Sequence, residues 1–490
     1  MVAPDELDLL ADGSLPGRWA RRWSERSPWP QVQDVDGAWI GSDELEERTR
    51  AGACAMLAAG LVRGDRLLIS AATSARFVIV YIAALRAGLI VVPVNTAYTS
   101  AELGRIVLDA RPRAAAVDNP ERAAWIDQVS RGSTAVFDLG LGGLAARGPS
   151  GSVDRLDSTD PALLLYTSGT TGEPKGALLT HGNLLSGATA VNLAWRWRRD
   201  DVLLLALPLF HLHGLGVGIN GSLCAGSSIV LRPRFETEDV ARRCREGISL
   251  FFGVPAMYQR LASSGSAGAL APVRLLVSGS APLPAALAHE IAAASGQIPL
   301  ERYGMTETVM LTSNPYDGPR KPGTVGFPLP GVELRLAGSG SDAPSGEVEV
   351  RGPSVIGSYY QRPDASAEAF TADGWFRTGD LGQLDEDGYL RLVGRSKELI
   401  ITGGFNVHPR EVEEALATHP DVREVAVVGR PSEAWGEEVT AIVVAERPVS
   451  AEQLLAHAGR VLTPYKVPKR IEFASELPRN TMGKILRSEL

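Results

Sequence analysis

The chain has 490 residues, of which 44% are hydrophobic and 22% are charged, so it is long enough for two or more domains with ordinary globular cores. Its 49 basic and 57 acidic residues give a formal net charge of −8, which argues against a nucleic-acid-binding role driven by charge. The three cysteines, Cys54, Cys224 and Cys244, are far apart in the sequence and predict reduced thiols in a cytoplasmic protein.

No membrane segment is expected. The most apolar stretch, residues 77–94, is interrupted by Arg86 and two glycines, so it fits a buried helix followed by a strand better than a bilayer span. The first residues are acidic and contain no apolar core, so we expect no signal peptide.

The first part of the chain alternates between expected helices and strands. Helices are predicted over 43–60, 74–87 and 99–109, the last with Ser100 as N-cap, and strands over 65–70 and 89–94. After residue 200 the same alternation predicts strands at 201–207, 228–231, 250–253 and 274–278, and helices at 214–225 and 237–246. Such alternation indicates parallel sheets with right-handed crossovers.

The pattern changes twice in the last third of the chain. From about residue 323, short alternating segments separated by turns predict an antiparallel β-rich subdomain. After Gly394 the strands expected at 398–401, 422–428, 438–445 and 470–473 and the helices expected at 409–418 and 451–461 form a small α+β unit. We therefore predict an N-terminal domain over 1–394 and a C-terminal lid domain over 395–490.

The stretch from Tyr166 to Gly176 is rich in glycine and hydroxyl residues and contains Lys175. It follows an apolar run at 162–165 that reads as a buried strand. A loop of this kind can turn its backbone N–H groups inward around an anion, and the lysine adds a charge suited to polyphosphate. It is not the GxxxxGK[ST] loop, because Gly176 follows Lys175. The alternative is a plain turn between two strands.

Five further stretches carry candidate chemistry, although each alone also fits an ordinary turn, helix cap or solvated side chain. Residues 278–283 follow a strand, where ligands of parallel sheets bind, and residues 302–308 combine a cation, an aromatic ring, a hydroxyl and a carboxylate suited to Mg²⁺. Residues 374–381 offer Asp380 to a ribose. Residues 394–409 hold two cations and a glycine pair at the expected domain junction, and residues 478–487 carry Lys484.

Together and in this order, the motifs resemble those of the acyl-activating branch of the adenylate-forming superfamily, which includes acyl-CoA synthetases. The resemblance covers essentially the whole chain. It implies an α/β fold, with a large N-terminal domain of two α/β sheets plus a β-barrel-like subdomain and a small mobile α+β C-terminal lid. It also implies two half-reactions, in which a carboxylate and MgATP give an acyl-adenylate and pyrophosphate, and coenzyme A then displaces AMP.

The resemblance assigns roles by position. The ATP-binding residues it implies are Thr167, Ser168, Gly169, Thr170, Thr171, Gly172, Lys175, Ser280, Ala281, Pro282, Arg302, Tyr303, Gly304, Thr306, Asp380, Arg395 and Lys484. Lys484, Thr306 and Glu307 are the implied catalytic residues, with Glu307 also the Mg²⁺ ligand. Lys397 matches the hinge position, and Gly403 and Gly404 would line the coenzyme A tunnel.

The acid to be activated depends on fewer residues. Arg302 directly precedes the Tyr-Gly-Met-Thr-Glu motif, and an arginine beside the acyl pocket favours a substrate with a second carboxylate. His211 and Ser278 are further candidate donors, and the combination resembles malonyl-CoA synthetases, which use malonate and often methylmalonate and so can feed polyketide synthesis. Arg302 could instead pair with Glu301 or a nucleotide phosphate. A ligase for a medium-chain or aryl acid and a module that loads a carrier protein are the alternative functions.

Overall fold

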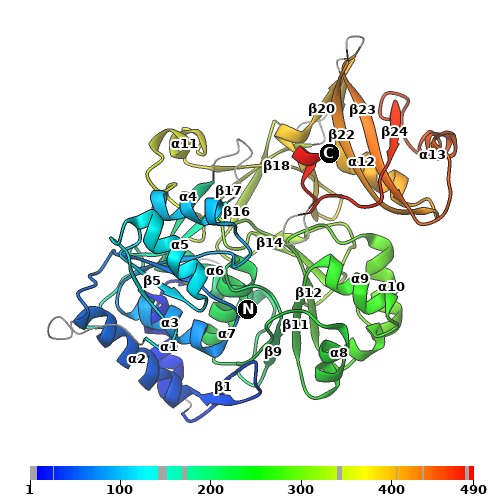
Figure 1. Cartoon of the computed structure of the whole chain (residues 1–490). Coiled ribbons are helices and arrows are strands. Elements are labelled where there is room, and N and C mark those ends of the chain that lie inside the picture. The colour runs from blue at the N-terminus through cyan, green and yellow to red at the C-terminus, as the bar shows by residue number, and fades with distance from the viewer. Residues whose placement is uncertain are drawn as a thin grey trace. The chain divides into compact units, whose positions relative to one another are not determined.

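The computed structural model describes residues 8–25, 27–141, 152–167, 174–338, 345–403, 405–432, 435–479 and 485–490. The chain divides into two compact units (Figure 1). Unit 1 comprises Met1–Pro322, Phe327–Glu333 and Arg351–Gly374, and unit 2 comprises Gly323–Gly326, Leu334–Val350 and Trp375–Leu490.

Unit 1 contains a six-stranded sheet in the order β6-β5-β3-β4-β7-β8. Its strands are parallel except for the antiparallel pair β7 and β8. They are β6 Ala135–Phe137, β5 Ala114–Val117, β3 Arg66–Ser70, β4 Ile90–Pro93, β7 Pro161–Thr167 and β8 Lys175–Thr180. The inner strands are buried along their whole length, which explains their continuous apolar sequences.

Two helices, α4 Ser100–Ala110 and α5 Pro120–Ser130, pack on one face of this sheet. Leu103, Ile106 and Ile126 of the helices share a core with Leu68 and Val92 of the strands. The expected N-cap at Ser100 is wrong by one residue. Thr99 is extended and forms a capping box with Glu102, because its hydroxyl accepts the Glu102 N–H and the Glu102 carboxylate accepts the Thr99 N–H.

A second, nine-stranded sheet of unit 1 has the order β15-β14-β13-β12-β11-β9-β10-β1-β2. The run from β13 to β1 is parallel, and the strands at the two edges are antiparallel. The strands are β15 Phe327–Pro328, β14 Thr312–Ser313, β13 Leu300–Tyr303, β12 Leu275–Ser278, β11 Leu250–Gly253, β9 Val202–Leu205, β10 Ser228–Leu231, β1 Pro30–Gln33 and β2 Trp39–Gly41.

Helices α8 Thr237–Arg245, α9 Pro255–Ser263 and α10 Ala285–Ser295 cover one face of the nine-stranded sheet, together with the 3-10 turn η3 Ala267–Leu270. Phe251 and Leu276 of the strands pack there against Val240, Tyr258 and Ile291. Since side chains alternate along a strand, Phe252 and Val277 point to the opposite face.

The remaining elements of unit 1 are α1 Leu15–Glu25, α2 Ser42–Ala58, α3 Ala75–Arg86, α6 His181–Ala194, η2 His213–Ile219, α7 Asn220–Ala225 and α11 Pro363–Glu368. A buried hydrogen bond from the Tyr81 hydroxyl to the side-chain Oδ1 of Asn220, at 3.0 Å, joins α3 to α7. The helix expected over 214–225 is real, but its first half is a π-helix, η2. Such wide turns recur near functional sites.

Unit 2 contains two sheets. The four-stranded one consists of β16 Glu333–Ala337, β17 Gly346–Arg351, β18 Phe376–Leu384 and β19 Leu390–Arg395, in that order. The five-stranded one has the order β21-β20-β23-β22, with β24 parallel to β23, and its strands are β21 Phe405–Val407, β20 Ile400–Thr402, β23 Gly436–Ala445, β22 Val422–Ser432 and β24 Arg470–Phe473. Its helices are α12 Pro409–Ala417 and α13 Ala451–Ala458, and its 3-10 turns are η4 Ser396–Glu398 and η5 Arg487–Glu489.

Val412 and Leu416 of α12 and Leu454 of α13 pack with Val427 and Val439 into a separate core, so the C-terminal part of unit 2 has its own apolar centre. The predicted α/β class is confirmed. Within the described part of the chain, no helix has both the length and the apolar character needed to cross a bilayer.

Candidate functional site

Many of the predicted site residues of unit 1 lie at the ends of two parallel strands of the nine-stranded sheet, β12 and β13. Ser278 ends β12, and Ser280, Ala281 and Pro282 follow it in the next loop. Arg302 and Tyr303 end β13, and the loop after them carries Gly304, Thr306 and Glu307. Carboxyl ends of parallel strands are where ligands of open α/β sheets bind.

Arg302 is a buried cation that forms no ion pair with a carboxylate of the described residues. Its side chain is 7% exposed, and Nε and Nη2 have no hydrogen-bond partner among the described residues. Burial lowers the pKa of the Arg302 guanidinium to about 9, so the group still carries its charge at neutral pH. A guanidinium in this position favours an anionic partner, since an unpaired buried charge is strongly destabilising.

His213 lies near this cation. It begins η2, is 2% exposed, and its ring stacks on Phe252 at 6.1 Å between centroids. Its Nδ1 is 3.3 Å from the Ser280 hydroxyl, and its Nε2 has no partner within the described part of the chain. Burial and the charge of Arg302 hold the pKa of His213 well below its ordinary value, so the ring is neutral at physiological pH. If the Ser280 hydroxyl donates to Nδ1, then Nε2 carries the ring hydrogen and is a donor.

Ser280 reaches His213 from an unusual backbone conformation. Its φ is +68°, in the left-handed region that residues other than glycine rarely adopt. Such strain persists only where the surroundings hold it, and it concentrates at ligand sites. The family resemblance assigns Ser280 to the ATP site, and the structure adds its contact with His213.

Ser278 and Arg302 are not brought together. Ser278 pairs in register with Glu301, and the carboxylate of Glu301 accepts the backbone N–H of Leu283 at 3.2 Å. Neighbouring residues on a strand face opposite sides, so Arg302 lies on the other face of the sheet, with Gly279. The alternative pairing of Arg302 with Glu301 is therefore not what the structure shows.

The Nδ1 atom of His211 stabilises the loop, and the predicted contact of His211 with the acid stays a prediction. That atom accepts the backbone N–H of His213 at 3.3 Å. Burial, and secondarily the Arg302 charge, lower the pKa of His211 to about 4. His213 was missed from the sequence because the Phe-His-Leu-His motif holds two histidines. The charge of Arg302 lowers the pKa of both, so both rings lie near it.

The predicted phosphate loop begins and ends on paired strands. Thr167 of β7 and Lys175 of β8 are partners in register, and the Thr167 hydroxyl donates to the Lys175 carbonyl oxygen at 3.3 Å. Ser168, Gly169, Thr170, Thr171 and Gly172 lie outside the described residues, as do Gly404 and Lys484.

Glu307 has the character of a Mg²⁺ ligand. Its side chain is 5% exposed, and its Oε1 accepts a hydrogen bond from the Tyr359 hydroxyl at 2.9 Å. Among the described residues, no group of three or more His, Cys, Asp or Glu side chains could enclose a metal ion. One carboxylate fits Mg²⁺ that takes its other ligands from phosphates and water.

The predicted ribose site lies in unit 2. Asp380 of β18 and Arg395 of β19 are partners in register, and their side chains form an ion pair at 2.9 Å. Asp380 is 6% exposed, so the carboxylate is held in place. Lys397 lies in η4, and Gly403 adopts φ +57° with its N–H bonded to the Trp435 carbonyl oxygen.

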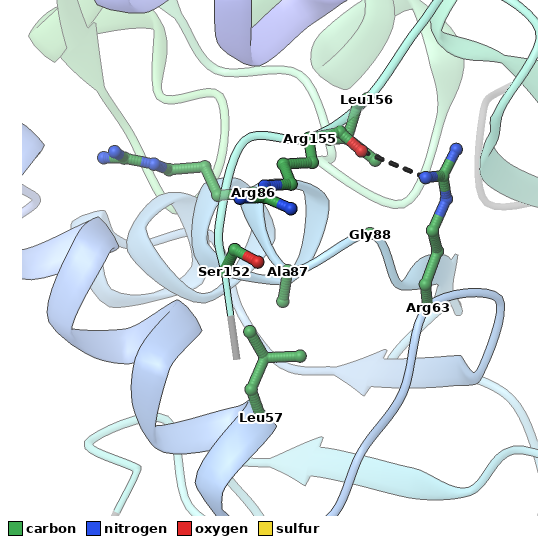
Figure 2. A pocket seen from close by; sticks show the side chains of 8 residues that line it. All are labelled: Leu57, Arg63, Arg86, Ala87, Gly88, Ser152, Arg155 and Leu156. Atoms are coloured by element: carbon green, nitrogen blue, oxygen red, sulfur yellow. Dashed lines mark hydrogen bonds between the residues drawn. The ribbon is translucent and has the colours of Figure 1, made fainter. Parts of the chain in front are cut away.

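A pocket of about 210 Å³ elsewhere in unit 1 contains three arginines but lies at the amino ends of β3 and β4 (Figure 2). Arg86 there is bonded to Asp154 and Glu46, and Arg63 pairs with Asp160 and donates to the Arg155 carbonyl oxygen. Since Arg63 and Arg86 already have carboxylate partners, the pocket is a structural junction.

Comparisons with known proteins cover almost the whole chain. The family model for AMP-binding enzymes matches residues 19–360, and that for the AMP-binding enzyme C-terminal domain matches residues 411–484. The chain is 36% identical over 476 residues to a malonate–CoA ligase of Arabidopsis thaliana, covering 88% of this chain and 78% of the relative. It is 35% identical over 494 residues to a feruloyl-CoA synthase of an Amycolatopsis species, covering 97% and 98%.

The crystal structure of ATP-bound MatB from Rhodopseudomonas palustris is similar along 97% of this chain and 98% of that chain, with a TM-score of 0.90 and 38% identity. These matches confirm the resemblance that the motifs predict. The chain therefore belongs to the AMP-binding enzyme family, with both its main domain and its C-terminal domain.

Proposed function

We propose that the chain is an ATP-dependent acid–thiol ligase that joins malonate to coenzyme A through an acyl-adenylate, with release of AMP and pyrophosphate. The family gives the reaction class. Overall similarity does not choose the acid, because the malonate and feruloyl relatives are about equally similar to this chain. The choice depends on the buried guanidinium of Arg302, whose Nε and Nη2 have no partner among the residues that the structure describes.

A dicarboxylate satisfies this arrangement. One carboxylate is activated, and the other would accept hydrogen bonds from Arg302 and from His213 Nε2–H, a second buried donor whose ring lies near Arg302. A monocarboxylic acid would leave both donors buried without an acceptor, which carries a desolvation cost of roughly 1–3 kcal/mol for a neutral group and more for a charged one. Methylmalonate carries the same second carboxylate and would use the same contacts.

The nucleotide contacts are proposed from the family positions. Thr167 and Lys175, with Ser168 to Gly172 between them, would hold the outer phosphates, Thr306 the α-phosphate, and Asp380 with Arg395 the ribose. Mg²⁺ bound at Glu307 would neutralise phosphate charge and so lower the barrier to attack by the substrate carboxylate. Ala281, Pro282, Tyr303 and Gly304 would frame the adenine.

The C-terminal part would act as a moving lid. We propose that it comprises residues 395–490 and turns about Lys397, so that Lys484 serves adenylation and the Gly403–Gly404 loop serves thioester formation. Two orientations of the lid would bring different residues to the same site, so that one enzyme catalyses both half-reactions.

The test is an acid panel assayed with ATP and free coenzyme A, using wild type and Arg302→Met. Removing one partner of a buried charge pair costs about 3–5 kcal/mol, so kcat/KM for malonate should fall by at least about 10²-fold. Activity with propionate should stay or rise, since its methyl end needs no cation.

Arg320→Met is the matched control. Arg320 is a partly buried arginine of unit 1, and unlike Arg302 it donates to the carbonyl oxygens of Ile298 and Pro315. An equal loss with malonate and propionate would assign Arg302 to the nucleotide or to folding. If the wild-type protein prefers an aryl acid, or transfers the acyl group only to a carrier protein, the malonate proposal is wrong.

We also propose a cytoplasmic location. All three cysteines are free, and burial raises the pKa of the Cys224 and Cys244 thiols to about 12. Unpaired thiols are typical of reducing compartments, which supports the proposal.

A further inference from the structure

Tyr359 lies between two groups that the proposed function assigns to MgATP. It belongs to the segment Arg351–Gly374, which returns to unit 1 after the chain has entered unit 2. Its hydroxyl donates to Glu307 Oε1 at 2.9 Å, and the ammonium of Lys175 stands 5.5 Å from the centroid of its ring. One side chain therefore contacts both the metal candidate and the last residue of the phosphate loop.

The backbone around Tyr359 is fixed on both sides. Tyr359 forms a β-bridge with Ala177 of β8, and the N–H of Tyr360 donates to the Gly176 carbonyl oxygen at 2.8 Å. On the other side, the N–H of Ile356 donates to the Glu307 carbonyl oxygen at 2.8 Å. The segment thus connects the strand that follows the phosphate loop with the loop that carries Glu307.

The direction of the hydrogen bond between Tyr359 and Glu307 follows from the chemistry of the two groups. The phenol O–H of Tyr359 donates, and the carboxylate of Glu307 accepts. A hydrogen bond from a fixed donor holds the carboxylate in one orientation. Partners of this kind orient side chains that bind a metal ion and raise the affinity for the metal.

We propose that Tyr359 is a positioning residue for MgATP, whose hydroxyl orients the Glu307 carboxylate for the metal ion while its ring supports Lys175 for the phosphates. This inference rests on the proposed function, in which Glu307 is the Mg²⁺ ligand. It assigns two separable effects to one side chain, because the hydroxyl acts on the metal and the ring acts on the lysine.

The test measures ATP binding to the full chain by calorimetry, once with Mg²⁺ and once with EDTA, in the absence of acid and coenzyme A. The ratio of the two affinities is the contribution of the metal. Tyr359→Phe should reduce this ratio by about tenfold, the lower end for a hydrogen bond to a charged group, and leave the affinity in EDTA unchanged. Tyr359→Leu removes the ring as well and should weaken binding in both conditions.

Tyr360→Phe is the matched control, because the Tyr360 hydroxyl accepts a hydrogen bond from Gln361 and has no contact with Glu307 among the bonds of the described residues. It should leave both affinities unchanged. Glu307→Gln tests separately whether Glu307 binds Mg²⁺, which the inference about Tyr359 requires. If Glu307→Gln lowers the metal contribution and Tyr359→Phe does not, the inference about Tyr359 is wrong. If neither does, Glu307 is not the metal ligand and the proposed site itself fails.

Discussion

Gly279 and Arg302 lie on the same face of neighbouring strand ends, and the guanidinium of Arg302 occupies the space into which a side chain at position 279 would project. A Cβ on Gly279 would overlap Cζ, Nε and Nη2 of Arg302. The glycine is therefore needed for close approach, and not for a positive φ. Because Gly279 has no side chain, the guanidinium of Arg302 can occupy this position.

Gly279→Ala should displace the guanidinium of Arg302 and lower kcat/KM for malonate by at least roughly tenfold. A loss of about 1.4 kcal/mol in transition-state binding is sufficient for a tenfold decrease. The monocarboxylic activity of the same variant should change less. Steady-state kinetics with malonate and propionate check this. Gly268→Ala is the control, because a Cβ there meets only the Ala294 carbonyl oxygen at 3.6 Å. Unchanged malonate kinetics in Gly279→Ala would mean that Arg302 has other productive positions.

Lys484→Ala should abolish the first half-reaction and spare the second. The developing charge on the attacked α-phosphate needs a fixed cation, whereas displacement of AMP by a thiol does not use this lysine in the proposed scheme. Malonate-dependent exchange between ATP and pyrophosphate measures the first half, and thioester formation from supplied malonyl-adenylate measures the second. Lys469→Ala, which removes another lysine of unit 2, is the control. Comparable loss of both halves would contradict the division of labour.

His181 should make unit 1 less stable in mild acid. The ring is fully buried, neither of its nitrogens has a partner among the described residues, and burial lowers its pKa to about 4 despite the opposing charge of Asp160. The unfolded chain binds a proton near pH 6.5 and the folded chain does not until about pH 4. The free energy of unfolding is therefore not reduced by His181 above pH 6.5. It decreases as the pH falls from 6.5 toward 4, by about 3 kcal/mol for this group.

The check is the melting temperature of wild type and His181→Gln at pH 7 and pH 5. The difference between the two pH values should be smaller in the variant. His289→Gln, at an exposed position, should behave like wild type. An unchanged pH dependence in His181→Gln would mean that other groups account for the acid sensitivity.

Much of the architecture follows from local sequence. The helix expected over 43–60 forms as α2, the one expected over 74–87 forms as α3, and each observed end lies within two residues of the prediction. Their apolar spacing and terminal glycines act over a few residues and need no distant partner. The N-cap at Ser100 was wrong because two adjacent hydroxyl residues compete, and only the backbone angle of Thr99 selects between them.

The motif order alone determined the family and the reaction class, because the phosphate loop, the strand-end loops and the segment around Asp380 are each contiguous in sequence. Tertiary structure decided the contacts between them. Tyr359 is 52 residues from Glu307, and His213 Nε2 is buried with no hydrogen-bond partner among the described residues. Such pairings depend on strand register and on the turn of η2, which arise only when distant segments pack, so no local pattern encodes them.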